Sequence, residues 1–287
     1  MASVGPQTAF SPAPTRLRQV AFVTEDLERA QYLLTKVLGT EVIYVDPAVS
    51  QWGLKNFLVA VGGDVIEVVS PITENTTAGR LLSKRGEGGY MIIMQTEDAA
   101  RRREYIESKE LAKVIFSHEQ DDAICVQYHP KGIKGGIMPE LDSHRVTPQN
   151  PNPITSRFSP WHACGHDYSS YSAAMKRRSH LHIHGIVCRL GPGDVDHEAA
   201  SREWEEIFGI PRSRDLLAFT NARMGFIRGV EGQPDGLMSI TIGVEGQDKF
   251  NAILDRAREE GLCGDGWINI LGVKWYFIYL GEGAETK

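Results

Sequence analysis

The chain has 287 residues, of which 41% are hydrophobic and 24% charged, a composition typical of a globular protein with one large domain or two ordinary ones. Its formal net charge of -6 argues against nucleic acid as the main partner. No apolar run is long enough to cross a bilayer as a helix. We therefore expect a small-molecule partner, with neither nucleic acid nor a membrane, and the sequence leaves monomer and homodimer open.

Residues 1–15 are rich in proline, serine and alanine and lack the basic start and apolar core of a signal peptide, so a flexible leader is predicted. The four cysteines are scattered and form no CxxC pair. We expect free thiols in a reducing compartment, which predicts a cytoplasmic protein. These cysteines are Cys125, Cys164, Cys188 and Cys263.

Hydrophobic periodicity predicts the same order of elements twice before residue 145: a strand, a helix and three strands. In the first unit these elements are expected at 17–24, 27–38, 40–47, 54–62 and 64–71. In the second unit they are expected at 88–98, 99–113, 113–119, 123–130 and 135–143. The stretch between the units, 72–87, predicts a mobile connection that forms a lip beside the site.

Four prolines between residues 145 and 160 mark 146–179 as a linker, whose later part is expected to be partly helical. The pattern then returns twice within 180–282, and its last unit is one strand short. The chain is therefore predicted to hold two pairs of one unit, at 16–145 and 180–282, divided by the linker.

One carboxylate stands inside the most apolar strand. By alternation, Glu67 shares a face with Val65 and Val69. A charged group in such a place needs a partner, a metal or a chemical role. The alternative is that this face of the strand is exposed to solvent.

Four ordered segments resemble the vicinal oxygen chelate superfamily, also called glyoxalase-like. They are LRQVAFVTEDLERA, DVIEVVSP, GGYMIIMQTED and QYHPKGIKGGIMPELD. The last segment also resembles methylmalonyl-CoA epimerases, and AGRLLSKRGEGGYMIIMQ resembles uncharacterised bacterial glyoxalase-like proteins. The resemblance is good over about 16–145 and weaker over 180–282. It implies an α+β fold in which paired βαβββ modules curl their strands into cup-shaped mixed sheets, with two module pairs in one chain and the second pair degenerate.

The resemblance also implies a divalent metal (Zn, Ni, Mn or Fe) in the cup. Matched position by position, its ligands fall on Gln19, Glu67, Met91 and Glu140, where Met91 replaces an expected histidine and offers a poor ligand. His129 is predicted to complete the metal set. Alternatively no metal binds, and Glu67 acts alone as a base whose pKa burial raises. Each residue also has a structural alternative, such as an interior amide at Gln19 or a local turn at His129.

The predicted function is a glyoxalase-like enzyme of secondary metabolism that moves a proton next to a carbonyl of a small oxygenated metabolite, as an isomerase, epimerase or lyase. Glu67 would be the catalytic base, Gln19 and His129 would hold substrate or metal, and Glu140 would ligate or donate. The alternative is a metal-free protein of this fold that binds or sequesters a small molecule. An extradiol dioxygenase ranks last, because the first pair lacks its two histidines.

Aromatic side chains near the predicted cup are candidates to line a substrate site, with core packing as the alternative. They are Tyr90, Trp52, Phe57 and Tyr128. In the second half, three histidines alternate along one strand and share a face. A metal there would need ligands from the linker, because the partner strands offer no glutamate. These histidines are His180, His182 and His184.

Overall fold

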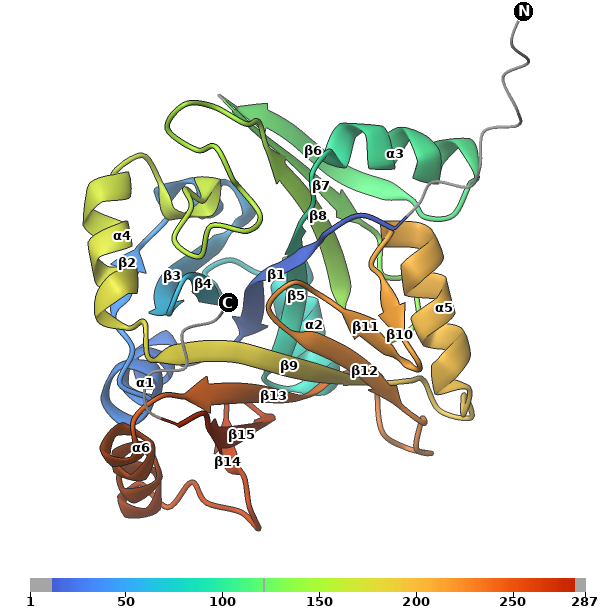
Figure 1. Ribbon diagram of the computed structural model, residues 1–287. Coiled ribbons are helices and arrows are strands. Elements are labelled where there is room, and N and C mark those ends of the chain that lie inside the picture. The colour runs from blue at the N-terminus through green and yellow to red at the C-terminus, as the bar shows by residue number, and fades with distance from the viewer. Residues whose placement is uncertain (1–11, 121, 282–287) are drawn as a thin grey trace, which may run out of the picture.

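The computed structural model describes residues 12–120 and 122–281, so most of the predicted leader lies outside the described residues. Its strands form two mixed sheets (Figure 1). The first sheet contains β1 (Arg16–Val23), β2 (Val42–Tyr44), β3 (Leu54–Val61), β4 (Asp64–Pro71), β5 (Gly88–Gln95), β6 (Val114–Gln120), β7 (Ala123–Tyr128) and β8 (Met138–His144). The second contains β9 (Leu181–Arg189), β10 (Arg212–Ser213), β11 (Leu216–Ala218), β12 (Arg223–Ile227), β13 (Gly236–Val244), β14 (Ile268–Ile270) and β15 (Val273–Tyr279).

The helices connect strands in the order that the sequence predicts. They are α1 (Leu27–Tyr32), the π-helix η1 (Leu33–Val37), the 3-10 helix η2 (Pro47–Trp52), α2 (Thr77–Arg85), α3 (Ala99–Ser108), the 3-10 helix η3 (His162–Cys164), α4 (Tyr168–Arg177), α5 (His197–Phe208) and α6 (Gln247–Glu259). In three of the four units, an aspartate accepts a hydrogen bond from the backbone at the start of the crossover helix. These N-caps are Asp26, Asp98 and Asp196, and each satisfies an N–H that the helix leaves unpaired.

Each sheet joins two units about its centre. In the first sheet the order is β2-β3-β4-β1-β5-β8-β7-β6, with β1 parallel to β4, β5 parallel to β8, and β1 antiparallel to β5. The second sheet repeats this arrangement as β10-β11-β12-β9-β13-β15-β14. Its last unit has one strand fewer than the others, as predicted. The α+β fold of paired βαβββ modules is therefore confirmed.

The predicted mobile connection at 72–87 is wrong, because most of it is the helix α2. Thr76 caps this helix by accepting a hydrogen bond from the backbone N–H of Gly79 at 2.9 Å. Ala78 and Leu82, four residues apart on one helix face, are buried in a small apolar cluster with Val69 of β4. Tertiary burial of one face thus makes a helix of a short segment whose periodicity is weak.

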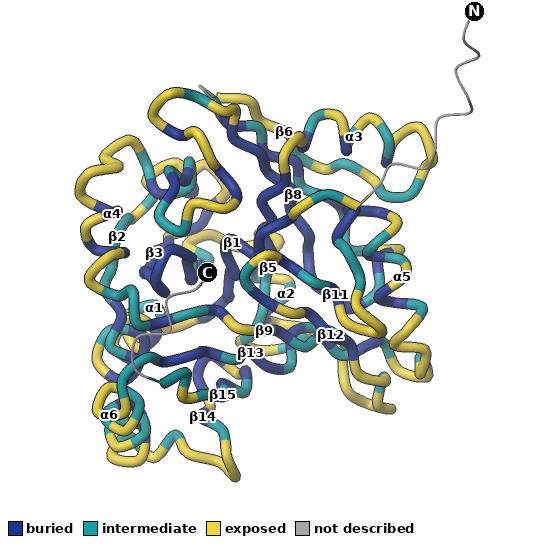
Figure 2. Tube along the Cα trace, in the orientation of Figure 1, coloured by how far each residue is buried: buried dark blue, intermediate teal, exposed yellow. Residues whose placement is uncertain are grey.

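The two halves of the chain share one hydrophobic core, seen as the dark interior of Figure 2. Phe22 of β1 stacks on Trp275 of β15 with ring centroids 5.5 Å apart. The side-chain amide of Asn221 accepts a hydrogen bond from the backbone N–H of Leu17 at 3.0 Å and donates one to the carbonyl oxygen of Leu17 at 2.9 Å. Arg102 of α3 donates to the carbonyl oxygen of Ile207 near the end of α5 at 2.8 Å. The largest core of the protein is therefore common to both halves.

We expect the protein to unfold in one cooperative transition, because the shared core couples the two sheets. Differential scanning calorimetry checks this, with a calorimetric enthalpy equal to the van't Hoff enthalpy as the expected result. Two resolved transitions would show that the halves are independent folding units.

Candidate active site

One face of the first sheet is concave and is called the cup below. Trp52 of η2, beside β2 at one edge of the sheet, packs edge-on against Phe116 of β6 at the other edge, with ring centroids 5.7 Å apart. The sheet is therefore curled enough for a side chain beside one edge to touch the strand at the other edge. The apolar floor of the cup consists of Ala21, Leu58, Ala60, Val65, Met91, Ile93 and Met138.

The predicted linker packs into the cup. Figure 1 shows its segment between β2–β4 on one side and β6–β8 on the other. Four of its side chains belong to the same buried cluster as the floor: Trp161, Cys164, Tyr171 and Met175. Trp161 is fully buried. The chain's own segment thus occupies part of the face on which a ligand of this fold would sit.

Glu67 lies in the cup, where alternation along β4 places it with Val65. It keeps partial exposure although its neighbours in β4 are buried. Its two carboxylate oxygens accept hydrogen bonds from the side-chain amides of Gln19, at 2.8 Å, and Asn56, at 2.6 Å. Burial raises the pKa of Glu67, and the two amide donors oppose that rise because they favour the ionised form.

Both amides are held in the orientation that offers an N–H to Glu67. The indole N–H of Trp161 donates to the carbonyl oxygen of Gln19 at 2.9 Å. The backbone N–H of Asp46 donates to the carbonyl oxygen of Asn56 at 3.0 Å. With each carbonyl oxygen engaged, both N–H groups must face the carboxylate. The two amides therefore favour a side chain at position 67 that accepts hydrogen bonds, such as a carboxylate, and disfavour one that donates them.

Tyr90 lies between two carboxylates of the cup. Burial and then the charges of Glu67 and Glu140 raise the pKa of Tyr90 to about 12. The phenol therefore stays protonated at neutral pH and remains a hydrogen-bond donor. Tyr90 also contacts the apolar clusters on either side of Glu67.

A second polar group lies on β7 and β8. Ligand atoms of Cys125, Glu140 and Asp142 lie within 4.8 Å of one another, and all three side chains are buried. The Nε2 atom of His162, from the linker, lies 2.7 Å from Oδ2 of Asp142. Burial and then the neighbouring carboxylate raise the pKa of Glu140 well above its usual range, and burial raises that of Asp142.

We expect Glu140→Gln to stabilise the chelator-treated protein increasingly as pH rises. A carboxyl group whose pKa is raised on folding contributes most stability below its unfolded pKa, and that contribution is lost as pH rises through the folded pKa. The glutamine side chain has no such dependence. Melting temperatures at about pH 5 and about pH 8 check this. The same difference between variant and wild type at both values would contradict the assignment of a buried charge to Glu140.

Two buried arginines hold the linker against β1. Arg18 donates to the carbonyl oxygen of Ser159 at 2.6 Å, and its guanidinium lies 5.3 Å from the ring centre of Trp161. Arg16 pairs with Asp64 and donates to the carbonyl oxygen of Ser156 at 2.9 Å. Burial, and then the nearby charge of Arg16, lowers the pKa of Arg18 to about 9.

The structure brings together three of the predicted site residues and separates the fourth. Gln19, Glu67 and Glu140 all lie in the cup. His129 follows β7 in a turn, where its Nδ1 atom accepts a hydrogen bond from the backbone N–H of Lys131 at 2.9 Å. Among the described residues, no hydrogen bond joins His129 to the other three.

The four predicted lining residues fall in different places. Tyr90 is in the cup, and Trp52, 48% exposed, lies at its rim. Phe57 and Tyr128 belong to the core shared by the two halves, and Tyr128 packs against Phe208 of α5. Both therefore lie on the face of the sheet opposite Glu67.

The ligand set implied by the resemblance does not fit a metal in this structure. The only donor oxygen of the Gln19 side chain already accepts from Trp161, both oxygens of Glu67 accept from amides, and Met91 supplies a thioether. A metal held by these residues would have to displace the indole from Gln19. We therefore route no chemical step through a metal at Glu67.

Sequence reasoning missed Asn56, Asp142 and Trp161, and it considered His162 only as a ligand for the histidines of the second half. Two of them carried a signal, since Asn56 alternates with Leu58 and Ala60 on one strand face, and Asp142 alternates with Glu140. Trp161 and His162 come from a segment in which no period places a side chain.

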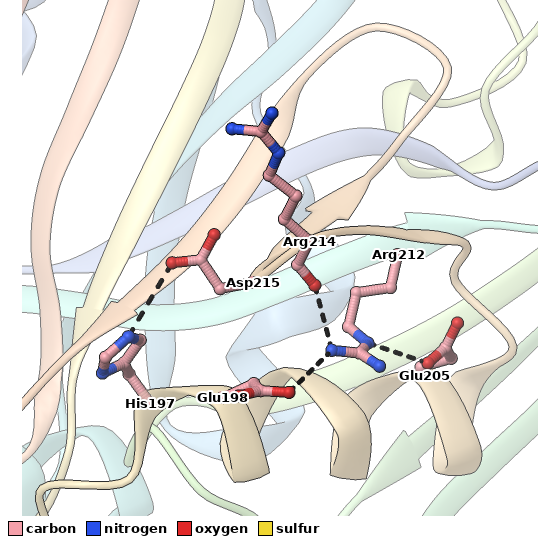
Figure 3. Close-up of a pocket in the computed structure, with 6 residues that line it drawn as sticks. All are labelled: His197, Glu198, Glu205, Arg212, Arg214 and Asp215. Carbon is pink, nitrogen blue, oxygen red and sulfur yellow. Dashed lines mark hydrogen bonds and ion pairs between the residues drawn. The ribbon is translucent and has the colours of Figure 1, made fainter.

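Polar groups in the second half are paired on the surface. His182 pairs with Glu245 at 2.7 Å, and His184 of the same strand is exposed. A surface pocket of about 550 Å³ lies over α5 and the β10–β11 turn. Figure 3 shows His197 facing Asp215, and Arg212 facing Glu198 and Glu205, with Arg212 donating to Glu205 at 3.0 Å. These contacts are exposed ion pairs, which we do not treat as a catalytic site.

The cysteines are free thiols, and three of the four are buried: Cys125, Cys164 and Cys188. Within the described part of the chain, we find no helix with the length and hydrophobicity that crossing a bilayer demands.

No protein-family model and no curated protein sequence matches the chain. Several solved structures, in contrast, are similar to the chain in fold. A triple mutant of 4-hydroxymandelate synthase from Streptomyces coelicolor is similar over 85% of this chain and 75% of that one, with 14% identity and a TM-score of 0.61. Methylmalonyl-CoA epimerases from Streptomyces coelicolor and Mycobacterium tuberculosis, each 20% identical with a TM-score of 0.41, cover 46% and 50% of this chain and 99% and 93% of their own. The chain has the vicinal oxygen chelate, or glyoxalase-like, fold.

Proposed function

We propose that the protein is an enzyme that moves a proton at a carbon next to a carbonyl group of a small oxygenated organic metabolite, as an isomerase, epimerase or lyase. The observation that carries this proposal is the environment of Glu67. Its carboxylate is desolvated, partly accessible, and fixed at both oxygens by Gln19 and Asn56. A carboxylate of raised pKa at a defined position is what a general base requires.

The residues around Glu67 can stabilise the negative charge that such a reaction moves from the carboxylate to the substrate. Glu67 takes the proton from the carbon, and its conjugate acid returns it to the same carbon or to a neighbouring atom. Between these two transfers, the negative charge that leaves the carboxylate of Glu67 lies on the carbonyl oxygen of the substrate. Tyr90 supports this step, because its phenol stays protonated and is available to donate a hydrogen bond to that oxygen. The apolar floor of the cup excludes water from both groups.

Solvent-exchange experiments test the proposal across several classes of substrate. We would incubate the protein in D₂O with panels of 2-oxo acids, 2-hydroxy ketones and acyl thioesters, and follow each carbon-bound hydrogen by NMR. The expected result is protein-dependent exchange of the hydrogen next to the carbonyl in one chemical class. Binding of a panel member without exchange would contradict proton transfer.

A metal-free binding protein is the second candidate, favoured by the position of the linker. Trp161 and Tyr171 fill part of the cup and offer aromatic surface toward the rest of it. Such a protein would hold a small aromatic molecule against these rings and leave it chemically unchanged. Thermal-shift screening combined with the exchange experiment distinguishes the two candidates, because a binder is stabilised by its ligand and yet catalyses no exchange of the ligand's carbon-bound hydrogens.

A further inference from the structure

The buried polar group on β7 and β8 has chemistry that the proposed function does not use. Register places Cys125 opposite Asp142, and Glu140 opposite Gln127 of the neighbouring strand. The ligand atoms of Cys125, Glu140 and Asp142 gather on the cup side of the sheet, and His162 of the linker contacts the carboxylate of Asp142. A thiol, two carboxylates and an imidazole therefore come from three separate segments of the chain.

The charges of this group are not balanced by the chain. Glu140 and Asp142 are 6% and 0% exposed. Among the described residues, the one side chain within ion-pair distance of either carboxylate that could carry a positive charge is His162, which is charged only when protonated. The Oδ1 atom of Asp142 is buried and has no hydrogen-bond partner in the described structure. Two adjacent buried carboxylates with a free acceptor oxygen are costly unless a cation or a shared proton neutralises them.

We propose that Cys125, Glu140, Asp142 and His162 bind a divalent metal ion of the zinc class. Thiolate, imidazole and carboxylate are the ligand types of zinc, whereas magnesium and calcium prefer oxygen alone. Four such ligands about 2.0–2.3 Å from one ion would stand roughly 3.3–3.8 Å apart. The ligand atoms of Cys125, Glu140 and Asp142 already lie within 4.8 Å of one another, and the imidazole of His162, which contacts Asp142, would turn toward the ion as the fourth ligand. This set shares only Glu140 with the ligands that the family resemblance implies.

The surroundings of His162 suit a metal ligand. Burial lowers the pKa of its imidazole by more than the charge of Glu140 raises it, which favours the neutral ring that a metal ligand requires. Metal binding would also tie the linker to β7 and β8, because His162 comes from the linker and the other three ligands from the sheet. The site would therefore fasten the segment that fills the cup.

Metal analysis of the full chain tests this site independently of turnover. We would purify the protein without chelator or affinity-tag metal and measure its metals by mass spectrometry, then titrate the chelator-stripped protein with Co²⁺. The expected result is about one equivalent of bound metal and a near-ultraviolet cobalt–thiolate charge-transfer band with the intense visible bands of a tetrahedral site. Absence of stoichiometric metal in both experiments would overturn the proposal and leave a shared proton.

Variants assign the ligands. Cys125→Ser should abolish the charge-transfer band, and Asp142→Asn or His162→Gln should weaken Co²⁺ binding at least tenfold. Cys263→Ser is the matched control, because Cys263 is the exposed thiol, and it should leave the band unchanged. A band that survives in Cys125→Ser and disappears in Cys263→Ser would place the metal elsewhere. If Cys125→Ser fails to fold, the melting temperature of the stripped wild type decides, since it must rise on addition of Zn²⁺ and not of Mg²⁺.

Glu67→Gln separates this inference from the proposed function. Glu67 is not among the proposed ligands, so the variant should retain the metal and its cobalt spectrum while losing exchange activity. Loss of the metal in Glu67→Gln would contradict the ligand set proposed above.

Discussion

Glu67→Gln is expected to lower the rate of proton exchange at least a hundredfold. A positioned general base contributes about 10²- to 10⁴-fold to such a step, and a glutamine cannot accept the proton. Gln19 and Asn56 both present N–H groups to position 67, so the new side chain also brings a donor against a donor. We would measure exchange and ligand binding on the same samples by NMR.

Glu97→Gln is the control for this change, because Glu97 is exposed after β5 and makes no contribution to the cup. It should exchange at the wild-type rate. The Glu67 variant should still bind the ligand, since the apolar floor and Tyr90 are unchanged. Exchange in Glu67→Gln within a few-fold of wild type would show that another group is the base.

Trp161→Ala is expected to destabilise the protein more than any other change discussed for the linker. Truncating a fully buried tryptophan costs about 3–5 kcal/mol, and this one also donates to Gln19 and stacks under Arg18. The melting temperature should fall by roughly 10 °C for a chain of this size. Thermal unfolding followed by circular dichroism measures the change. Cys164, 2% exposed in the same cluster, should also react faster with a thiol reagent.

Two substitutions resolve what Trp161 contributes. Trp161→Phe keeps an aromatic ring in the cup and removes the N–H, which leaves the carbonyl oxygen of Gln19 without its donor and should cost about 1–3 kcal/mol. Trp267→Ala is the control, because Trp267 is partly exposed outside the cup and lies against Gly264 and under Lys274, where the cation–π contact is worth about 0.5–1 kcal/mol. If Trp161→Ala melts no lower than Trp267→Ala, the linker does not pack into the cup as described.

The fold could be predicted from the sequence because the patterns that indicate its strands and helices lie within short stretches of the chain. Each unit shows its strand and helix through periods of two and 3.6 residues, and alternation placed Glu67 on the correct face of β4. The helix α2 was not predicted because it is stabilised by burial of Ala78 and Leu82 against the sheet, whereas the hydrophobic periodicity of its sequence is weak. Phe57 and Tyr128 were placed near the site by proximity along the chain, although one step of alternation puts them on the other face of the sheet.

The surroundings of Glu67 depend on contacts between distant segments. Trp161 meets Gln19 across 142 residues of sequence, and no local pattern encodes such a contact. The prolines of 146–179 predict irregular chain correctly, yet they do not indicate where that chain packs. The same holds for His162. Its partner Asp142 lies two residues after the predicted ligand Glu140, and the sequence pattern did not identify Asp142 as part of the site.

The pH dependence of exchange tests most directly the claim that the Glu67 carboxylate is the base. Burial raises its pKa above the ordinary value of 4.5, and Asn56 opposes that rise by donating a hydrogen bond. The exchange rate should therefore fall as pH falls through this raised pKa, since protonation removes the base. In Asn56→Ala the lost donor should move that fall to higher pH. A rate that does not vary over the acid range, or a fall at the same pH in both proteins, would contradict the account.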